Sequence, residues 1–594
     1  MKIKRNLQFL VSIFTFASLI LCKSSCDAST WISLNNNPTD PVTNPLLQTD
    51  GTILVQGSNP TTSQHIWKLT PDAFGNYANG TWSQLASLPI ISGTQYAPLG
   101  HASAVLADGR IIFIGGEYNG NVNDWTNLGA VYHPRIDTWT ALAPPSFFPT
   151  RIGDAPSIVL PDGTFMLGST QDKQGALLDP QTLTWSPANM TGKFDVSDEE
   201  GWVLLPNGNV LTVDCGVFTG EKSPATTAEY YNFPGGGWTR TTNTPVSLSD
   251  KGFETGASVL MADGNVLAIG ANGNSAIYDY QTNLWTVGPT LPIMNGQQLC
   301  MADGTAALLP NGNVVFGASP LDAELDADKP VHIFEYDGTN FVQQTDMPGS
   351  SNNSSAVLNM LVLPSGQILV THQSPGVKIY VPTGTYDPIW QPQILNTANN
   401  VTANNTYRID GTLFNGMSQG GMYGDDFQMA TNYPIVRITN QVTNHVFYCR
   451  THDHSSMAVA AVGVPVYTYY DVPANIESGY SMLEVVANGI PSALFPIVVN
   501  PNVTPAATAT PSSQTIKSRS STNIVFTSTI SGTTFSWPAP SQTNASGGGA
   551  GTGSTLIQTL TATSTSQGKV IYTITPTANG IQGKPITVTI TVNP

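Results

Sequence analysis

Acidic side chains and one histidine recur at a regular distance before a series of glycines. Each lies eight to ten residues before a glycine that follows Asp or Asn: His101, Asp154, Glu199 and Glu200, Glu254, and Asp303. Arg151 lies three residues before Asp154. Clustered carboxylates repel one another unless a cation, a proton or an arginine offsets their charge, and hard divalent cations prefer oxygen ligands. The pattern therefore predicts an acidic site for a divalent cation or a polyol, with a solvated polar rim as the alternative.

A second candidate metal site is the string His452-Asp453-His454. In an extended strand His452 and His454 share one face, where their ring nitrogens can bind one metal ion, and Asp425 and Asp426 can add oxygen ligands. Structural hydrogen bonding is the alternative interpretation of these side chains. The sequence shows no Ser-His-Asp context, phosphate-binding glycine loop or paired zinc cysteines.

A repeat must position the acidic residues. Its unit is an apolar strand, an Asp-Gly or Asn-Gly turn, a second apolar strand, a Tyr-Asp-Pro-like strand and a Trp-bearing strand, as in HASAVLADGRIIFIGG followed by AVYHPRIDTW. The turn glycines recur about every 50 residues, the period of kelch repeats, at Gly51, Gly109, Gly163, Gly208, Gly264, Gly312 and Gly366. Each kelch repeat is one four-stranded propeller blade. We therefore expect an all-β chain with a seven-bladed kelch β-propeller over residues 29–384, and the acidic residues around its mouth.

Local features of the repeat support this prediction. Asp-Gly and Asn-Gly are typical of tight type I′ hairpins, in which both residues take positive φ. A tryptophan ends most units, and we expect these side chains to pack between neighbouring blades: Trp82, Trp139, Trp185, Trp238 and Trp285, with Phe341 in the sixth unit. Ser29-Thr30-Trp31 resembles these strands but precedes the first unit, so we expect it to form the outer strand of the last blade.

The N-terminus is typical of an export signal. Lys2, Lys4 and Arg5 precede an apolar run from Leu7 to Leu21, and cleavage after Ala28 is plausible, so residues 1–28 are predicted to be a signal peptide. An uncleaved anchor, or a lipidated Cys22, is the alternative. We expect no membrane span after signal cleavage and a secreted or cell-surface protein. A net charge of −17 and a pI of about 4.7 argue against nucleic-acid binding.

Two immunoglobulin-like β-sandwiches are expected after the propeller. Residues 385–501 carry alternating strands, residues 502–513 are predicted to be a linker, and residues 514–594 form a small Ser/Thr/Gly-rich unit. Cys215, Cys300 and Cys449 remain once the signal is removed. Either one disulfide with one free thiol or three buried thiols fits this number.

A kelch propeller followed by an early-set, immunoglobulin-like sandwich resembles galactose oxidase and glyoxal oxidase, the copper radical oxidases. It resembles still more closely bacterial kelch-repeat proteins of unassigned activity. The resemblance covers about residues 45–500, and its most specific segments are GTLFNGMSQGGMYGDDFQMATNYPIVRIT (411–439) and NHVFYCRTHDHSSM (444–457). It implies a fold rather than an activity.

The resemblance also implies where an oxidase would carry its copper ligands. The oxidases have a Tyr-His pair before a late propeller turn, a second tyrosine crosslinked to a cysteine, and a histidine on a sandwich hairpin. Those positions correspond here to Ala356 and Val357, to Asp154 and Gly100, and to His445. Because alanine, valine and glycine side chains cannot bind Cu(II), we expect no copper radical cofactor.

The leading hypothesis is an exported binding protein, not an oxidase, with a glycan, a cell-surface ligand or a divalent cation at the acidic propeller mouth. One alternative is an enzyme, either a divergent copper oxidase or a carboxylate-based hydrolase. Another is a surface adhesive or structural protein with an inert mouth. In the leading hypothesis the hairpin near His445, or the string His452-Asp453-His454, approaches the mouth.

Overall fold

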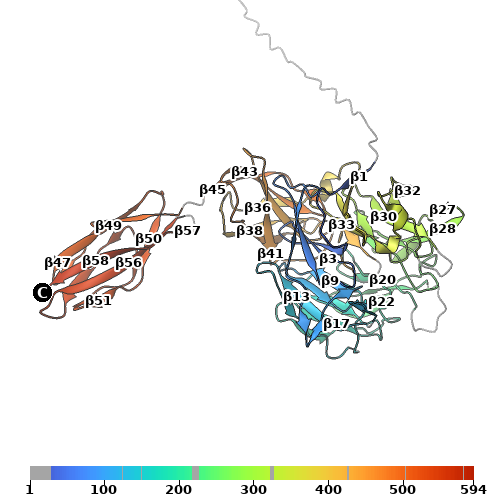
Figure 1. The fold of residues 1–594 in the computed structure, drawn as a ribbon, viewed down its shortest axis with the longest axis horizontal. Coiled ribbons are helices and arrows are strands. Elements are labelled where there is room, and N and C mark those ends of the chain that lie inside the picture. The colour runs from blue at the N-terminus through green and yellow to red at the C-terminus, as the bar shows by residue number, and fades with distance from the viewer. Residues whose placement is uncertain are drawn as a thin grey trace, which may run out of the picture.

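The computed structural model describes residues 29–123, 125–148, 150–216, 226–321, 327–423, 427–501, 504–578 and 581–594. The predicted signal peptide, residues 1–28, lies outside the described residues. Within them the chain is all-β, and its helical elements are three short 3-10 helices, η1 (Ser350–Asn352), η2 (Ser355–Val357) and η3 (Pro388–Trp390). Figure 1 shows a large body that contains the propeller and the first sandwich, and a separate C-terminal domain to one side. The predicted all-β fold class is confirmed.

The described propeller residues form seven antiparallel units of four strands each. Each unit runs from an innermost to an outermost strand. The first unit consists of β2 (Val42–Leu47), β3 (Ile53–Gly57), β4 (Ile66–Thr70) and β5 (Thr81–Gln84), and the second of β9 (Ala102–Val105), β10 (Ile111–Ile114), β13 (Gly129–His133) and β14 (Thr138–Ala141). The third unit consists of β15 (Ser157–Val159), β16 (Phe165–Gly168), β17 (Gly175–Asp179) and β18 (Thr184–Pro187), and the fourth of β19 (Val203–Leu204), β20 (Val210–Val213), β21 (Ala228–Tyr231) and β22 (Trp238–Arg240). The fifth unit consists of β23 (Ser258–Leu260), β24 (Val266–Ile269), β25 (Ser275–Asp279) and β26 (Leu284–Val287). The sixth consists of β29 (Ala306–Leu308), β30 (Val314–Pro320), β31 (His332–Tyr336) and β32 (Phe341–Gln343). The seventh consists of β33 (Asn359–Val362), β34 (Ile368–Thr371), β35 (Lys378–Val381) and β1 (Thr30–Ser33). Innermost strands of neighbouring units contact one another in the pairs β2 and β9, β9 and β15, β19 and β23, β23 and β29, and β29 and β33, and β33 contacts β2.

The turn between the first two strands of each unit is not the expected type I′ turn. In the second unit Gly109 N donates to Leu106 O at 2.9 Å, and Leu106 N donates to Arg110 O at 2.8 Å. Gly109 has φ 83°, whereas Asp108 is not among the residues with positive φ. This is a type I turn whose last residue is left-handed, so only the glycine needs the unusual conformation. Asp108 has another role, since its Oδ1 accepts from Arg110 N.

The outer strands join each unit to the one before it. The indole Nε1 of Trp82 donates to Asn36 O, that of Trp139 to Ala86 O and that of Trp185 to Ala143 O, at 2.8 to 3.0 Å. Strand β1 pairs with β35, with Trp31 opposite Tyr380, and the Trp31 indole donates to Thr345 O at 2.8 Å. Trp31 therefore contacts the end of the sixth unit just as the other tryptophans contact their preceding units. The N-terminal strand closes the ring, as expected.

The first sandwich is one nine-stranded sheet that folds over its own core. Its order is β36 (Gln393–Asn396), β38 (Thr406–Thr412), β42 (Val466–Asp471), β41 (Val446–His452), β40 (Ile435–Asn440), β43 (Gly479–Ala487), β45 (Phe495–Asn500) and β37 (Asn400–Thr402), with β44 (Ile490–Pro491) beside β43. Alternate residues of β40, including Val436 and Ile438, face the buried core, which also contains the Cys449 thiol.

A segment of this sandwich enters the propeller. Strand β39 (Gly421–Met422) pairs with β29, the innermost strand of the sixth unit. Gln419 Oε1 accepts from Leu204 N of the fourth unit at 2.9 Å, and the Tyr423 hydroxyl donates to Ala356 O at 2.7 Å. We call residues 415–433 the axial segment, because they contact the innermost part of several units. Asp425 and Asp426, the expected extra metal ligands, lie outside the described residues.

The C-terminal domain has its own core, which includes Phe526, Phe535, Trp537 and Tyr572. Its main strands are β47 (Ser513–Lys517), β49 (Ile524–Ser528), β50 (Thr534–Trp537), β55 (Thr559–Ala562), β56 (Gly568–Ala578) and β58 (Ile586–Asn593). The predicted linker 502–513 is too long, because β46 (Ala507–Thr510) already pairs with β49. The three described cysteines are buried free thiols, so the alternative without a disulfide holds.

Candidate functional site

The repeat places most of the predicted residues at one end of the innermost strands. His101 directly precedes β9, Asp154 precedes β15, Glu199 and Glu200 precede β19, Glu254 precedes β23, and Asp303 precedes β29. Because these strands surround one axis, residues far apart in the sequence arrive at one level. We call this level the mouth.

Glu199, Glu254 and Asp303 form the centre of the mouth. One carboxylate oxygen of each lies within 4.8 Å of the other two. Asp303 N donates to Thr255 O at 3.1 Å, and the Thr255 hydroxyl donates to Glu199 O at 3.2 Å. Glu199 and Asp303 have φ 59° and 45°, in the left-handed region that costs a non-glycine residue about 1–3 kcal/mol. The surrounding structure therefore holds these carboxylates in place against a backbone preference.

The three carboxyl groups of this triad interact directly with one another. Side-chain hydrogen bonds join Glu254 to Asp303 and to Glu199, and a hydrogen bond between two carboxyl groups requires a proton on one of them. Burial, followed by the neighbouring charge of Asp303, raises the pKa of Glu254 well above its usual range. A divalent cation would take the place of that proton and would relieve the repulsion.

Two further buried carboxyl groups extend the mouth beyond the triad. Burial and the charge of Asp198 raise the pKa of Asp154, which also interacts electrostatically with Asp303. Burial and the charge of Asp195 raise the pKa of Asp198 to about 7. Asp154 Oδ1, Asp198 Oδ1 and Glu254 Oε2 are buried and have no hydrogen-bond donor among the described residues. Such atoms fit a cation-binding site, because an ion would satisfy oxygens that the protein leaves unsatisfied.

His101 is not a member of the triad. His101 is fully buried, its Nε2 lies 3.3 Å from Asn44 Nδ2, and its ring contacts Phe427 of the axial segment edge-on at 5.4 Å. Burial lowers the pKa of His101 to about 3, so the ring is neutral at physiological pH. Arg151 is exposed.

Glu200 faces away from the mouth into a second, fully buried cluster. The Lys193 ammonium lies 2.6 Å from Glu200 Oε1, 2.9 Å from Glu229 Oε1, 3.1 Å from Asp195 Oδ1 and 4.0 Å from Asp214 Oδ1. One oxygen of each carboxylate lies within 4.8 Å of the others. We call these five residues the Lys193 cage. Its ammonium occupies the centre of what would otherwise be a set of metal ligands.

The Lys193 cage holds more negative than positive charge. Burial alone would lower the pKa of Lys193, but the surrounding carboxylates, Glu200 first, raise it well above its usual range. Asp214 is the member farthest from the ammonium, and neither of its oxygens accepts a geometrically good hydrogen bond from a described residue. Burial raises the pKa of Asp214, which favours the neutral form of this carboxyl group in the cage.

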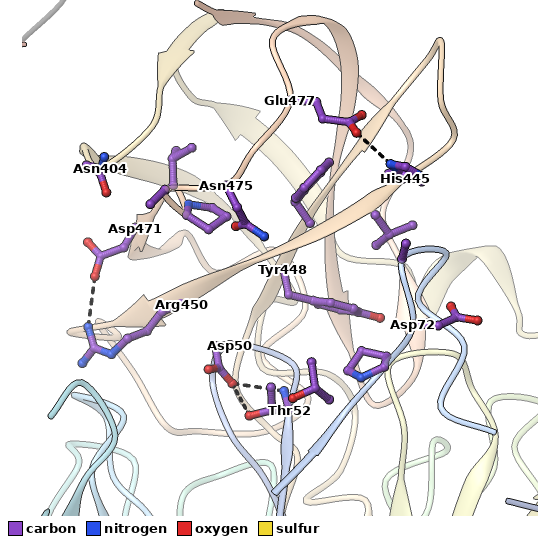
Figure 2. Close-up of a pocket in the computed structure, with 18 of the residues that line it drawn as sticks. Asp50, Thr52, Asp72, Asn404, His445, Tyr448, Arg450, Asp471, Asn475 and Glu477 are labelled. Carbon is purple, nitrogen blue, oxygen red and sulfur yellow. Dashed lines mark hydrogen bonds and ion pairs between the residues drawn. The ribbon is translucent and has the colours of Figure 1, made fainter. Parts of the chain in front are cut away.

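The structure places the sandwich histidines away from the mouth, which corrects the expectation that they approach it. His445 Nδ1 pairs with Glu477 Oε1 at 2.7 Å (Figure 2). The His445 ring also contacts Phe74, in the loop between β4 and β5 of the first unit, at 5.4 Å. The oxidase-like hairpin therefore packs on the outside of the propeller. The axial segment, which no periodic pattern marks, enters instead.

The rings of His452 and His454 bind different partners. His452 lies between Asp453 Oδ2 at 2.8 Å and Asp471 Oδ1 at 3.3 Å. His454 is buried, its Nδ1 lies 2.8 Å from the Thr468 hydroxyl, and burial lowers its pKa to about 3. These contacts are structural hydrogen bonds, the alternative to a metal site at His452-Asp453-His454.

Sequence reasoning missed Asp198 and Glu117 at the mouth and most of the Lys193 cage. Glu117 lies in the loop before β11 (Tyr118–Asn119), where burial raises its pKa and Asp303 adds to the effect. Asp198 lies ten residues before Gly208, within the repeat spacing, but Glu199 and Glu200 at the same spacing stand for this unit in the prediction. Glu117 does not lie at the repeat spacing. The charge run from Asp195 to Glu200, which places four acidic residues in six positions, is a further signal for Asp198.

Comparisons with known proteins agree with this architecture. Residues 514–594 match the family described as a PKD-like domain. The chain is 25% identical over 273 residues to Kelch-like protein terF of Aspergillus terreus (strain NIH 2624 / FGSC A1156), a match that covers 41% of this chain and 54% of that protein. The chain therefore spans about half the length of that relative.

Two solved propellers are also similar. The WD40 β-propeller domain of Doa1 aligns with a TM-score of 0.37 and 12% identity over 60% of this chain and 97% of that chain. The structure of U3-55K aligns with a TM-score of 0.38 and 9% identity over 60% of this chain and 98% of that chain. By its own strand topology the chain is an all-β propeller protein. It is similar to a kelch-like protein, and its residues 514–594 match a PKD-like domain.

Proposed function

We propose that this protein is an extracytoplasmic binding protein whose propeller mouth holds a divalent cation of the calcium type and uses it to bind a hydroxyl-rich ligand. The observation that carries the proposal is the triad of Glu199, Glu254 and Asp303, whose oxygens lie within 4.8 Å of one another. All three ligands are oxygen atoms, which favours calcium or magnesium over copper or zinc. Calcium also accepts ligand hydroxyls and water in its remaining coordination positions.

The short distance between the carboxylate oxygens of the triad argues against the alternative of a carboxylate-based hydrolase. Glycosidases place their two carboxyl groups about 5–9.5 Å apart, so that the scissile bond and a nucleophile or water fit between them. Glu254 hydrogen-bonds directly to both other members of the triad, which leaves no such space. The geometry is therefore that of ligands around one ion.

An extracytoplasmic location rests on two features. Residues 1–28 have the charge and hydropathy pattern of an export signal, and a PKD-like domain is typical of extracellular proteins. Within the described part of the chain, no helix is long and apolar enough to cross a bilayer.

Thermal unfolding of chelator-treated protein tests the proposal. A ligand that binds only the folded state raises stability with its concentration, so calcium at about 100 times its Kd should raise the Tm by about 2 °C or more. Glu254→Gln and Asp303→Asn should each remove most of this shift. Asp263→Asn is the matched control, because Asp263 lies at the other end of β23 from Glu254, in an exposed turn.

Two results would contradict the proposal. One is a Tm that neither calcium nor magnesium changes in the parent protein. The other is a calcium-induced shift of equal size in the parent protein and in Glu254→Gln, because the ion would then bind elsewhere.

A further inference from the structure

A large cleft lies between the propeller and the first sandwich, outside the mouth. Its volume is about 1000 Å³, and it lies beside β41, which Figure 2 shows crossing above the turn that holds Asp50 and Thr52. The propeller side consists of this turn, the loop at Asp72 and the exposed Arg135 between β13 and β14. The sandwich side consists of Asn404, the end of β42 and the loop that follows it. Clefts of this size between domains are common ligand sites.

The walls of the cleft are fixed by contacts between the two domains. Val446 N donates to Ala73 O at 2.8 Å, and Arg450 donates to Asp108 O at 2.7 Å and to Asp471 Oδ2 at 3.2 Å. Figure 2 shows this Arg450–Asp471 pair at one end of the cleft and the His445–Glu477 pair at the other. Both ends are therefore held before any ligand arrives, which lowers the entropic cost of binding.

Several polar groups in the cleft have no partner among the residues that the structure describes. The side chains of Asn404, Asn475 and Arg135 are exposed and make no hydrogen bond or ion pair with another described residue. Asp50 Oδ1 accepts from Thr52, while its Oδ2 accepts from no described residue. The cleft thus offers two amides that both donate and accept, one guanidinium donor and one carboxylate acceptor.

The charge and the aromatic lining narrow the ligand class. Four carboxylates line the cleft, Asp50, Asp72, Asp471 and Glu477, against the two guanidinium groups of Arg135 and Arg450. This excess of negative charge disfavours phosphate, sulfate and other anionic ligands. Tyr448 lies against Gly51 and borders the cleft, so it can contact the apolar face of a sugar ring.

We propose that this cleft binds a neutral, hydroxyl-rich ligand, a short oligosaccharide, through Asn475, Arg135 and Asp50. The site needs no metal ion, because its lining groups donate and accept hydrogen bonds directly. It is separate from the mouth, and its occupancy does not depend on calcium.

Isothermal titration of the full chain tests the proposal with four tetrasaccharides, cellotetraose, mannotetraose, xylotetraose and maltotetraose, and with tetralysine as a cationic probe, each with calcium and with chelator. At least one tetrasaccharide should bind the parent protein with a Kd of about 1 mM or tighter. The double variant Arg135→Ala/Asn475→Ala should weaken this binding about tenfold or more, since it removes two direct contacts. Asn340→Ala, which removes an exposed amide from the β31–β32 turn, should leave the Kd unchanged.

Other outcomes would overturn the proposal. Failure of all four tetrasaccharides to bind would do so, as would binding of tetralysine alone, which would indicate a cationic ligand. Equal affinity in the parent and the double variant would place the ligand elsewhere. Binding that both chelator and Glu254→Gln abolish would place it at the mouth, which would support the proposed function and contradict this second site.

Discussion

Glu199 and Glu200 are neighbours in the chain, yet they belong to two different electrostatic sites. Glu199 contributes to the triad at the mouth, and Glu200 lies 2.6 Å from the buried Lys193 ammonium. The backbone turns at Glu199, whose φ is 59°, so the two adjacent side chains face different ways and one short segment supplies both sites. Because Glu199 and Glu200 are adjacent, the position of Glu200 in the Lys193 cage restricts where Glu199 can lie.

Removal of the single cation from the cage should be strongly destabilising. Lys193→Met leaves four buried carboxyl groups without their counterion, and loss of one partner of a buried ion pair typically costs about 3–5 kcal/mol. Urea unfolding of the variant should show this loss in the free energy of unfolding. The control is Lys68→Met, because Lys68 makes no ion pair with a described residue. A change below about 1 kcal/mol in Lys193→Met would contradict the assigned role.

In contrast to Lys193→Met, Asp214→Asn should not lower the free energy of unfolding at alkaline pH. Asp214 lies 4.0 Å from the ammonium, and burial raises its pKa. Because the raised pKa means that ionisation of Asp214 is unfavourable in the folded protein, the neutral amide avoids that ionisation, and at pH 8.5 the variant should be at least as stable as the parent. Parallel urea titrations of both proteins measure the sign, and a large loss of stability would show that the cage needs this charge.

The pKa of Asp198 predicts a pH dependence whose sign can be stated. Its folded-state pKa is about 7 against an ordinary value of 3.8, so the folded state holds the proton more tightly. This contribution to stability is complete below pH 3.8 and is lost as the pH rises through 7. In chelator, the stability of the parent relative to Asp198→Asn should fall by about 2–3 kcal/mol between pH 5 and pH 8.

The comparison with Asp198→Asn is needed because other groups titrate in the opposite direction. Burial lowers the pKa of His101 and His454 to about 3, so these rings favour folding increasingly as the pH rises towards 6.5. Subtraction of the variant removes their effect. A pH-independent difference between parent and variant would mean that Asp198 is ionised throughout.

The repeat made some mouth residues predictable and left others out. Asp154, Glu254 and Asp303 were found because each lies at a fixed offset from a turn glycine, and propeller geometry carries that offset to one axis. Asp198 has a comparable offset from Gly208, but the offset alone does not separate it from the neighbouring Glu199 and Glu200. Lys193 was not predicted, since only the fold reveals that a lone lysine faces four carboxylates from the fourth unit and the loop before it.

At the scale of elements, β1 completes the last unit of the propeller. The Trp31 indole donates to Thr345 O, and its ring contacts Tyr380 at 5.1 Å. Trp82 has the equivalent position in the first unit, where its indole donates to Asn36 O. Trp31 and Trp82 therefore make equivalent contacts with the preceding unit at different places in the ring.

Trp31→Ala and Trp82→Ala should lower the free energy of unfolding by similar amounts, about 2–4 kcal/mol each, since each removes a large aromatic side chain and one hydrogen bond. Denaturant unfolding followed by circular dichroism measures both. Phe74→Ala, which removes an exposed aromatic ring, should have a much smaller effect. If Trp31→Ala matched the parent while Trp82→Ala did not, β1 would not contribute to ring stability.

Strand patterns allowed the units to be predicted, but the axial segment could not be. Its sequence around Gly416, Gly420 and Gly421 has no period of two or of 3.6, and its backbone hydrogen-bonds to strands more than 100 residues away. The resemblance to the oxidases directed attention to the hairpin at His445 instead. A non-periodic segment that enters a propeller is recognised by its partners, and these are known only from the fold.

At the scale of the whole molecule, the C-terminal domain is energetically separate from the rest. Its core residues pack against one another, and its strands pair among themselves. Removal of residues 504–594 should therefore leave the Tm of the propeller and first sandwich unchanged, and calorimetry should show the loss of one transition only. A fall in the remaining Tm would reveal contacts that stabilise the two parts together.

The axial segment has a consequence for how the protein is assembled during synthesis. Leu204 N and Leu308 N, on innermost strands, donate to Gln419 and Gly420, which are made only after the last propeller strand. While the chain is being made, β1 can already pair with the edge of the last unit. The backbone donors along the axis of the ring lack their partners until residue 433 has emerged. A chain that ended at residue 384 would contain every strand of the ring and still lack the groups that complete its interior. The independent folding unit is thus not the repeat array but the array together with the sandwich that follows it.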